Sequence, residues 1–261
     1  MRQSSVWLAV FFLLGVALVP RVLSSRAPAK PAARKAVVVE LFTSEGCSSC
    51  PPADRLLASL EQERSTNGAE IIPLGFHVDY WDFQGWRDRF DSPAYTSRQE
   101  QYAERFHIQG PYTPQMVIDG EEEFVGSSSS HARSAIASAA ASPQLAEIEI
   151  SAPKPDSLAV KVTAPGPSTA QVLFAITEDN LESKVAAGEN GGHVLRHAAV
   201  VRDLRVLGRL DRGSLQVSVP LKLDASWKKQ DLRYVVFVQD GTLGKIGGAA
   251  SLTAASGAGL H

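Results

Sequence analysis

Cysteine, net charge and long apolar runs are all scarce in this chain of 261 residues. Two cysteines are too few for the disulfide framework of a small secreted mini-protein or for a zinc site with four thiolates. A formal net charge of -2 gives no overall attraction to nucleic acids or acidic membranes. The apolar run Val6–Val19 has 14 residues, fewer than the roughly 20 that a membrane-spanning helix needs. A hydrophobic content of 44% supports a sizeable core, which excludes the disordered and collagen-like classes.

The first residues have the layout of an export signal. Arg2 precedes the apolar run, Pro20 breaks it, and small residues follow around Ser24. We expect residues 1–24 to be a signal peptide and residues 25–35 a linker, so that the folded part is periplasmic or secreted. The alternative is an uncleaved N-terminal anchor, because no A-x-A cleavage site follows the run.

Residues 36–142 show the pattern of an α/β domain. Two continuous apolar runs predict strands covered on both faces, and Pro73 in the second run indicates an edge strand or an irregular start. Ser92-Pro93 predicts the N-cap and first residue of a helix. The elements expected in chain order are a strand at 36–43, a helix after Cys50, a strand at 70–78, a helix at 93–106, a hairpin at 115–125 that turns at Asp119-Gly120, and a closing helix within 127–142.

From residue 143 to residue 250 the hydrophobic pattern mostly has a period of two. This alternation is typical of strands with one buried face, and no helical stretch separates the runs. We therefore expect an antiparallel β-sandwich, followed by a flexible tail at 251–261. The strands are expected at 145–150, 157–162, 171–177, 200–206, 215–219 and 234–239, with a seventh near 245–252.

The motif Cys47-Ser48-Ser49-Cys50 joins the first strand to the first helix. Free N–H groups at a helix N-terminus stabilise a thiolate, and a second nearby thiol resolves a mixed disulfide. We therefore expect Cys47 to attack and Cys50 to release the product. The order of elements is that of a thioredoxin-like fold, in which Thr113 and Pro114 would form a cis-proline loop that binds an extended substrate. The predicted fold class is an α/β thioredoxin-like domain followed by an all-β antiparallel sandwich-like domain.

Four further residues are candidates for the same site. An ionised Glu45 would raise the pKa of Cys47. His77 would complete a soft ligand set for copper with the two thiols, or is simply a satisfied strand histidine. Asp79 is either an acid/base residue or a turn-forming cap. Trp81 belongs to an aromatic loop that is either a substrate platform or packing over the sheet.

His193 and His197 have the i, i+4 spacing that binds zinc when it occurs on a helix. The surrounding residues predict a strand, in which the two side chains lie about 13 Å apart and cannot chelate one ion without a bend. We therefore assign no metal ligand here. One position open to the flexible glycine-rich loop at 188–192 is against the thiol site, although no residue spacing establishes it.

Several segments of the chain resemble a known family. They are VVELFTSEGCSSCPPAD at 38–54, FHVDYW at 76–81, Gly85-Trp86, SPAYTSRQ at 92–99, YTPQMV at 112–117 and GENGGHVLRHAAVVR at 188–202. They are similar to the secreted thioredoxin-like family catalogued as domain of unknown function 1223. The resemblance covers about residues 36–250 and implies a thioredoxin fold and a β-rich domain in an exported bacterial protein. It implies no particular reaction. The Ser-Ser interior of the motif, its two following prolines and Glu45 depart from characterised disulfide oxidoreductases.

We expect an exported protein that exchanges thiols and disulfides with an extracytoplasmic protein substrate and is recycled by a redox partner. We expect no cofactor, no nucleic acid partner and no membrane contact beyond the alternative N-terminal anchor. Two other functions stay open. One is a non-enzymatic binding protein with a structural disulfide, and the other is a copper-handling protein that uses Cys47, Cys50 and His77.

Export predicts that the leader is lost in the cell. Protein recovered from an extracytoplasmic fraction should begin between about residues 23 and 30 when its intact mass is measured. A chain that keeps Met1 and stays in the membrane fraction would show an anchor instead.

Overall fold

The computed structural model describes residues 35–66, 69–166 and 170–254, which lie in one compact unit, Arg34–His261. The expected signal peptide lies outside the described residues, as does nearly all of the expected linker. The helices are α1 (Pro51–Glu63), α2 (Pro93–Phe106) and α3 (Ser129–Ala141), with short 3-10 helices η1 (Asp82–Gln84) and η2 (Lys229–Asp231). The strands are β1 (Lys35–Thr43), β2 (Ser65–Thr66), β3 (Ala69–His77), β4 (Gln115–Ile118), β5 (Glu122–Val125), β6 (Glu147–Lys154), β7 (Ser157–Thr163), β8 (Gln171–Glu178), β9 (Leu181–Lys184), β10 (Val194–His197), β11 (Val200–Arg209), β12 (Ser214–Pro220), β13 (Leu232–Gln239) and β14 (Ile246–Thr253).

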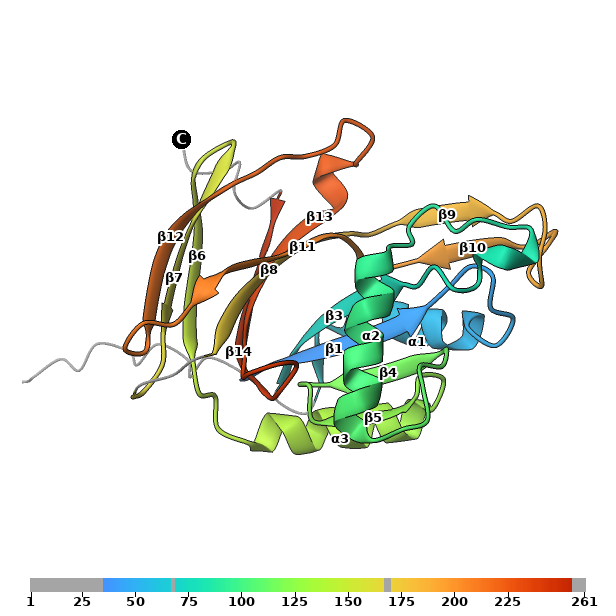
Figure 1. Ribbon diagram of the computed structural model, residues 1–261. Coiled ribbons are helices and arrows are strands. Elements are labelled where there is room, and N and C mark those ends of the chain that lie inside the picture. Colours follow the sequence, from blue (N-terminus) through green and yellow to red (C-terminus); the bar gives the residue numbers. More distant parts are fainter. Residues whose placement is uncertain (1–34, 67–68, 167–169, 255–261) are drawn as a thin grey trace, which may run out of the picture. The chain divides into compact units, whose positions relative to one another are not determined.

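One large mixed sheet runs through both halves of the sequence (Figure 1). Its strand order is β14-β13-β8-β11-β3-β1-β4-β5, and β2 pairs with β3 outside this path. Strand β3 is parallel to β1 and β11, whereas the other neighbours on the path are antiparallel. A second sheet has the order β12-β7-β6, and β9 and β10 form a separate hairpin.

The predicted fold class is wrong, because the expected sandwich strands do not form a domain of their own beside an α/β thioredoxin-like domain. Strands β8, β11, β13 and β14 instead continue the sheet of β1, β3, β4 and β5, and strands predominate over the three α-helices in the described residues. The junction is a single pair, Val200 with Gly75, and the Gly75 amide donates to the Ala199 carbonyl at 2.8 Å. Such a short parallel pairing leaves no pattern in the sequence.

Three large apolar clusters build most of the core on both faces of the sheet. Because side chains alternate along a strand, one face of β1 carries Val37 and Leu41 against α1 and α3, and the other carries Val38 and Phe42 against α2. Further along the sheet, Phe174 and Val236 face the three-stranded sheet β12-β7-β6. The large sheet is therefore covered by helices and by a second sheet.

The helix starts follow the sequence closely. Helix α1 begins at Pro51 with Cys50 as its N-cap residue, where prolines cost no helical hydrogen bond. Helix α2 begins at Pro93, and the Ser92 hydroxyl accepts a hydrogen bond from the Ala94 amide at 3.3 Å.

The expectation that Pro73 marks an edge strand or an irregular start is wrong, because β3 is a continuous interior strand. The amides of Ile71 and Gly75 donate to Arg64 and Ala199, on the side of β3 away from β1. Because backbone directions alternate along a strand, the nitrogen of Pro73 points to the same side as the amides of Ile71 and Gly75. On that side β11 pairs with β3 only at Gly75. A missing N–H is therefore tolerated at Pro73.

Three differences concern the second half of the chain. The expected strand around His193 and His197 is split, because Ala199 has a φ of 51° between β10 and β11. The short strand β9 was not expected at all. In addition, residues 251–253 of the expected flexible tail belong to β14.

A buried polar network links α2 to both halves of the large sheet. Arg98 donates to Glu40 of β1 at 2.7 Å and to Gln239 of β13 at 3.0 Å. The Tyr102 hydroxyl donates to Glu40 and accepts from Gln239 at 2.9 Å. Burial alone would lower the pKa of Arg98, but Glu40 raises it on balance, so Arg98 stays charged. This network satisfies the buried carboxylate of Glu40.

Arg98→Met should lower the free energy of unfolding by about 3–5 kcal/mol, because it leaves Glu40 buried without a cation. The exposed pair of Arg133 with Glu63 provides a matched control, and Arg133→Met should cost less than about 1 kcal/mol. Denaturant unfolding measures both. Equal losses for the two variants would contradict a special role for the Arg98 network.

Candidate functional site

Cys47 and Cys50 form a disulfide at the start of α1, with their Cα atoms 5.4 Å apart. Cys47 lies in the loop after β1, where its amide donates to the Ser44 carbonyl at 3.2 Å. Neither cysteine has exposed surface, whereas Ser48 and Ser49 between them are exposed. The two serines therefore form the outer surface of the motif.

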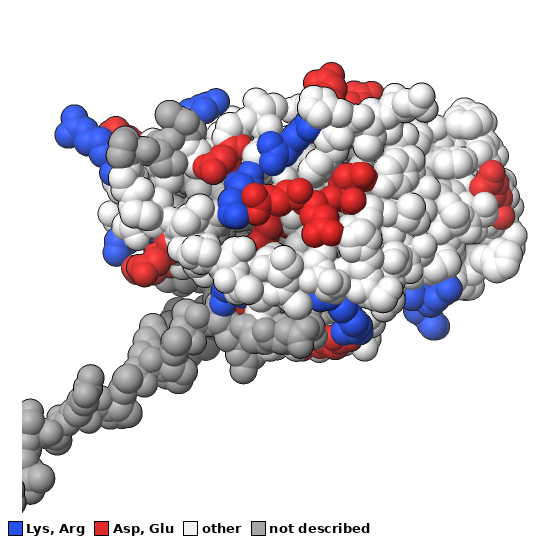
Figure 2. Space-filling view, turned by 90° about the horizontal axis from the view of Figure 1, so that it is seen from below, with Lys and Arg blue, Asp and Glu red and all other residues white. Residues whose placement is uncertain are grey.

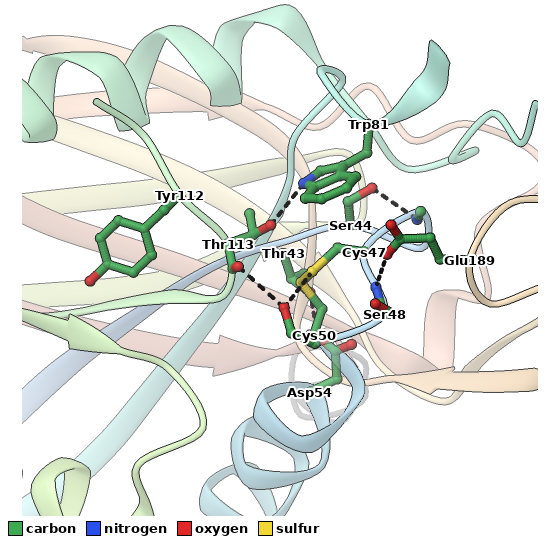
Figure 3. Close-up of a disulfide and its surroundings, with 12 residues drawn as sticks. Thr43, Ser44, Cys47, Ser48, Cys50, Asp54, Trp81, Tyr112, Thr113 and Glu189 are labelled. Carbon is green, nitrogen blue, oxygen red and sulfur yellow. Dashed lines mark hydrogen bonds between the residues drawn. A yellow bond between two sulfur atoms is a disulfide. The ribbon is translucent and has the colours of Figure 1, made fainter. Parts of the chain in front are cut away.

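The peptide bond between Thr113 and Pro114 is cis, which confirms the prediction from the sequence. The Ser49 hydroxyl donates to the Thr113 carbonyl at 3.4 Å, so this loop lies beside the disulfide (Figure 3). The Trp81 indole donates to the Thr113 hydroxyl at 2.8 Å. A Cβ on Gly46 would lie 2.9 Å from the Trp81 Cβ, so only glycine permits this approach. The structure thus brings the predicted residues Trp81, Thr113 and Pro114 to the motif.

Glu45 is buried under the motif. Its carboxylate accepts hydrogen bonds from the Trp86 indole at 2.8 Å and pairs with His197 Nε2 at 3.1 Å. Burial by itself would raise the pKa of Glu45, but the bonds from His197 and Trp86 lower it on balance. Glu45 is therefore ionised, and hydrogen bonds from His197 and Trp86 stabilise its charge. The sequence did not link it to His197, which lies 152 residues away.

His77 also lies in this buried region, bound to Asp88. Its Nδ1 is 2.6 Å from Asp88 Oδ2, and Asp88 also accepts from the amides of Glu45 at 2.8 Å and Phe90 at 2.9 Å. Burial would lower the pKa of His77, but Asp88 raises it on balance. His77 is therefore tied to a carboxylate and not to the sulfurs. Across the described part of the chain, no three His, Cys, Asp or Glu residues are arranged to hold a metal ion.

Asp54 is a site residue that the sequence reasoning missed. It lies one helical turn after Cys50, is buried, and accepts a hydrogen bond from the Thr43 hydroxyl at 2.8 Å. Figure 3 places its side chain close to Cys50. Burial raises the pKa of Asp54, so the carboxyl retains a proton more readily than an ordinary aspartate. The sequence could have indicated Asp54, because residues four positions apart on a helix are neighbours and Asp54 is four residues after Cys50.

Asp79 serves α2 and not the disulfide. Its carboxylate accepts a hydrogen bond from the Thr96 hydroxyl at 2.6 Å, and its amide is 3.2 Å from the same oxygen. This contact ties the loop after β3 to α2, whose N-cap residue is Ser92, so Asp79 itself does not cap the helix.

The loop between β9 and β10 closes over the cysteine motif. Glu189 accepts a hydrogen bond from the Ser48 amide at 3.0 Å (Figure 3). The Asn190 side chain donates to the carbonyls of Glu45 at 2.9 Å and Cys47 at 3.0 Å. His193 and His197 have different partners, since His193 bonds to the Asn190 carbonyl and His197 to Glu45. Sequence spacing carried no signal for these contacts.

On the face shown in Figure 2, acidic side chains gather beside Lys and Arg side chains and no continuous basic surface forms. Within the described residues no helix combines the length and the apolar character that crossing a membrane requires.

The fold and the site define a protein with a large mixed sheet and a buried Cys-x-x-Cys disulfide at the start of a helix. The chain belongs to the family described as Protein of unknown function (DUF1223), whose model matches residues 38–239. It is similar to a protein of Agrobacterium tumefaciens known from an X-ray crystal structure, with 26% identity and a TM-score of 0.70 over 86% of this chain and 96% of that one.

A second solved structure is a domain of the outer membrane lipoprotein Omp28 from Porphyromonas gingivalis. It has 13% identity and a TM-score of 0.26 over 42% of this chain and 88% of that one. None of the curated proteins compared with the chain matches it.

His77→Gln should destabilise the protein in a pH-dependent way. The pKa of His77 in the folded protein is raised above its ordinary 6.5. The stability that its charge contributes is therefore fully present below pH 6.5 and is lost as the pH rises through the pKa of the folded state. The pKa of Asp88 in the folded protein is lowered from its ordinary 3.8. The stability that its carboxylate contributes is therefore present above pH 3.8 and is lost as the pH falls through the pKa of the folded state. The loss caused by the substitution should therefore be largest near pH 5, at about 3 kcal/mol, and smaller at pH 9.

Denaturant unfolding at several pH values measures this loss. His131→Gln is the control, because His131 pairs with Glu122 on the exposed surface. A loss for His77→Gln that is the same at pH 5 and pH 9 would contradict a charged His77–Asp88 pair.

Proposed function

We propose that this protein is an exported thiol–disulfide exchange protein that acts on an extracytoplasmic protein partner through Cys47 and Cys50. The observation that carries the proposal is the position of the disulfide at the N-terminus of α1, beside Asp54 and the Thr113 loop. A bridge that closes only four residues adds little stability by restricting the unfolded chain. Reactivity is therefore the better explanation for it.

The exchange is a two-electron transfer. In the reduced protein the Cys47 thiolate attacks a partner disulfide, so that a Cys47–partner bond forms and one partner sulfur leaves as a thiolate. The Cys50 thiol then loses its proton and attacks Cys47 Sγ, which releases the second partner thiolate. The partner gains two electrons, and the protein is left with the Cys47–Cys50 disulfide. A dithiol partner reverses the same steps.

Asp54 is the group placed to take the proton of Cys50. Its carboxyl is buried one turn below that cysteine, and its pKa is raised by burial, which makes the carboxylate a stronger base than an exposed aspartate. When the disulfide is reduced again, the same carboxyl returns the proton to Cys50. Export supplies the oxidising compartment in which this chemistry is useful.

The complete burial of both cysteines favours a second candidate, a non-enzymatic binding protein with a structural disulfide. In that case the loops around the motif form a recognition surface and the sulfurs never react. In the first candidate the exposed Ser48–Ser49 turn moves to admit a partner. The copper-handling alternative has no ligand set among the described residues, since Cys47, Cys50 and His77 do not form a group arranged to hold a metal ion.

The reduction potential of the cysteine pair distinguishes the two candidates. Equilibration with glutathione buffers, followed by alkylation and mass spectrometry, should give a value between about -120 and -270 mV for an exchange protein. A value below roughly -300 mV would favour the structural disulfide and overturn the proposal.

Cys50→Ser should accumulate mixed disulfides with partner proteins, because Cys47 can still attack but nothing resolves the product. Cys47→Ser is the matched control and should trap far less. Non-reducing gels of an extracytoplasmic extract compare the two. Equal trapping, or slow and equal alkylation of both cysteines in the reduced wild-type protein, would contradict the assigned roles.

A further inference from the structure

The β9–β10 loop places one uncompensated charge against the cysteine motif. Glu189 Oε2 accepts the hydrogen bond of the Ser48 amide, which is the peptide group that directly follows Cys47. The Glu189 side chain is exposed, and the hydrogen bonds from Ser48 lower its pKa, so it is ionised at neutral pH. No ion pair within residues 35–254, apart from the undescribed short gaps, includes Glu189.

Asn190 fixes the place of this charge. Its side chain is buried and donates to the carbonyls on both sides of Gly46, namely those of Glu45 and Cys47. The loop itself is closed by the Gly192 amide, which donates to the Val185 carbonyl at 2.8 Å. Glu189 is therefore held at the motif by its neighbour and not only by its own hydrogen bond.

A negative charge in this position opposes ionisation of Cys47. The carboxylate repels a thiolate, and it also occupies the Ser48 N–H, whose dipole would otherwise favour a nearby anion. Glu45 differs, because His197 and Trp86 donate to its carboxylate. Of the two glutamates at the motif, Glu189 is thus the one whose charge is left open to solvent and to a partner.

We propose that Glu189 restrains Cys47 from becoming a thiolate and selects partner disulfides that carry positive charge beside their sulfurs. A partner cation pairs with Glu189 when the complex forms, which removes the repulsion at the moment when Cys47 must attack. The inference rests on the proposed exchange function and names its substrate class. A disulfide flanked by Lys or Arg residues fits this chemistry, whereas an acidic one meets repulsion.

The first experiment follows alkylation of Cys47 by iodoacetamide in the fully reduced protein from pH 6 to pH 10. Glu189→Gln keeps a hydrogen-bond acceptor for Ser48 but removes the charge, so the midpoint for Cys47 should fall. Below the midpoint the rate should rise about threefold, which corresponds to half a pKa unit. The gain should shrink in high salt, because an exposed charge is screened.

Other ionisable groups around Cys47 are common to the wild type and the variant. They are Glu45 in its own loop, Asp54 on α1, His77 on β3, Asp88 after η1 and His197 on β10. Glu182→Gln is the matched control, because Glu182 is an exposed acid of the same hairpin that pairs with Arg196. It should leave the Cys47 profile unchanged. Equal shifts for Glu189→Gln and Glu182→Gln, or no shift for either, would overturn the proposal.

The second experiment compares two small disulfides, the dication cystamine and the dianion 3,3′-dithiodipropionate. Reduced wild-type protein should react faster with cystamine, and the ratio of the two rates should fall at least threefold in Glu189→Gln. Glu189→Ala should give the same ratio as Glu189→Gln. A change seen only in Glu189→Ala would mean that the side chain acts by shape, and it would overturn the charge-based proposal.

These outcomes are separable from failure of the proposed function. The alkylation profile of Cys47 needs no partner, so it reports on Glu189 even if the oxidised wild-type protein resists glutathione. That resistance would refute exchange, whereas an unchanged profile in Glu189→Gln refutes only the role of Glu189.

Discussion

The pairing of Gly75 with the chain at Ala199 and Val200 is the interaction on which the rest of this structure depends. One hydrogen bond of 2.8 Å joins β3 to the start of β11 and makes one sheet of strands from both halves of the sequence. A Cβ on Gly75 would lie 3.4 Å from the carbonyls of Ala198 and Ala199, so the approach is close. Strand β10 ends just before this junction. The pairing therefore positions His197 and the loop that precedes β10 next to the cysteine motif.

The site is consequently a product of both halves. The first half supplies Cys47 and Cys50, and the second half supplies His197, Asn190 and Glu189, which bond to residues of the motif or its loop. Buried carboxylates are costly without partners, and here each has one. The same arrangement that stabilises the loop therefore also sets the charges that surround the disulfide.

Sequence patterns predicted the local elements well. Cys50 with two following prolines predicted the start of α1, Ser92-Pro93 predicted that of α2, and Asp119-Gly120 predicted the turn between β4 and β5. Each of these depends on residues a few positions apart. Pro73 was misread, because its tolerance in an interior strand depends on where β11 begins to pair.

The sequence by itself determined the helices, most strands and the Cys-x-x-Cys motif, since backbone preferences and short spacings decide these. The cis bond before Pro114 was predicted from the order of the elements and not from local preference, because most X–Pro bonds are trans. Only the tertiary structure decided that the strands of both halves share one sheet, that both cysteines are buried, and that Glu189 faces the motif from 141 residues away. Those features depend on strand pairing and charge contacts between distant segments. No periodicity within one segment encodes them, because the free energy that selects them is gained only when the segments meet.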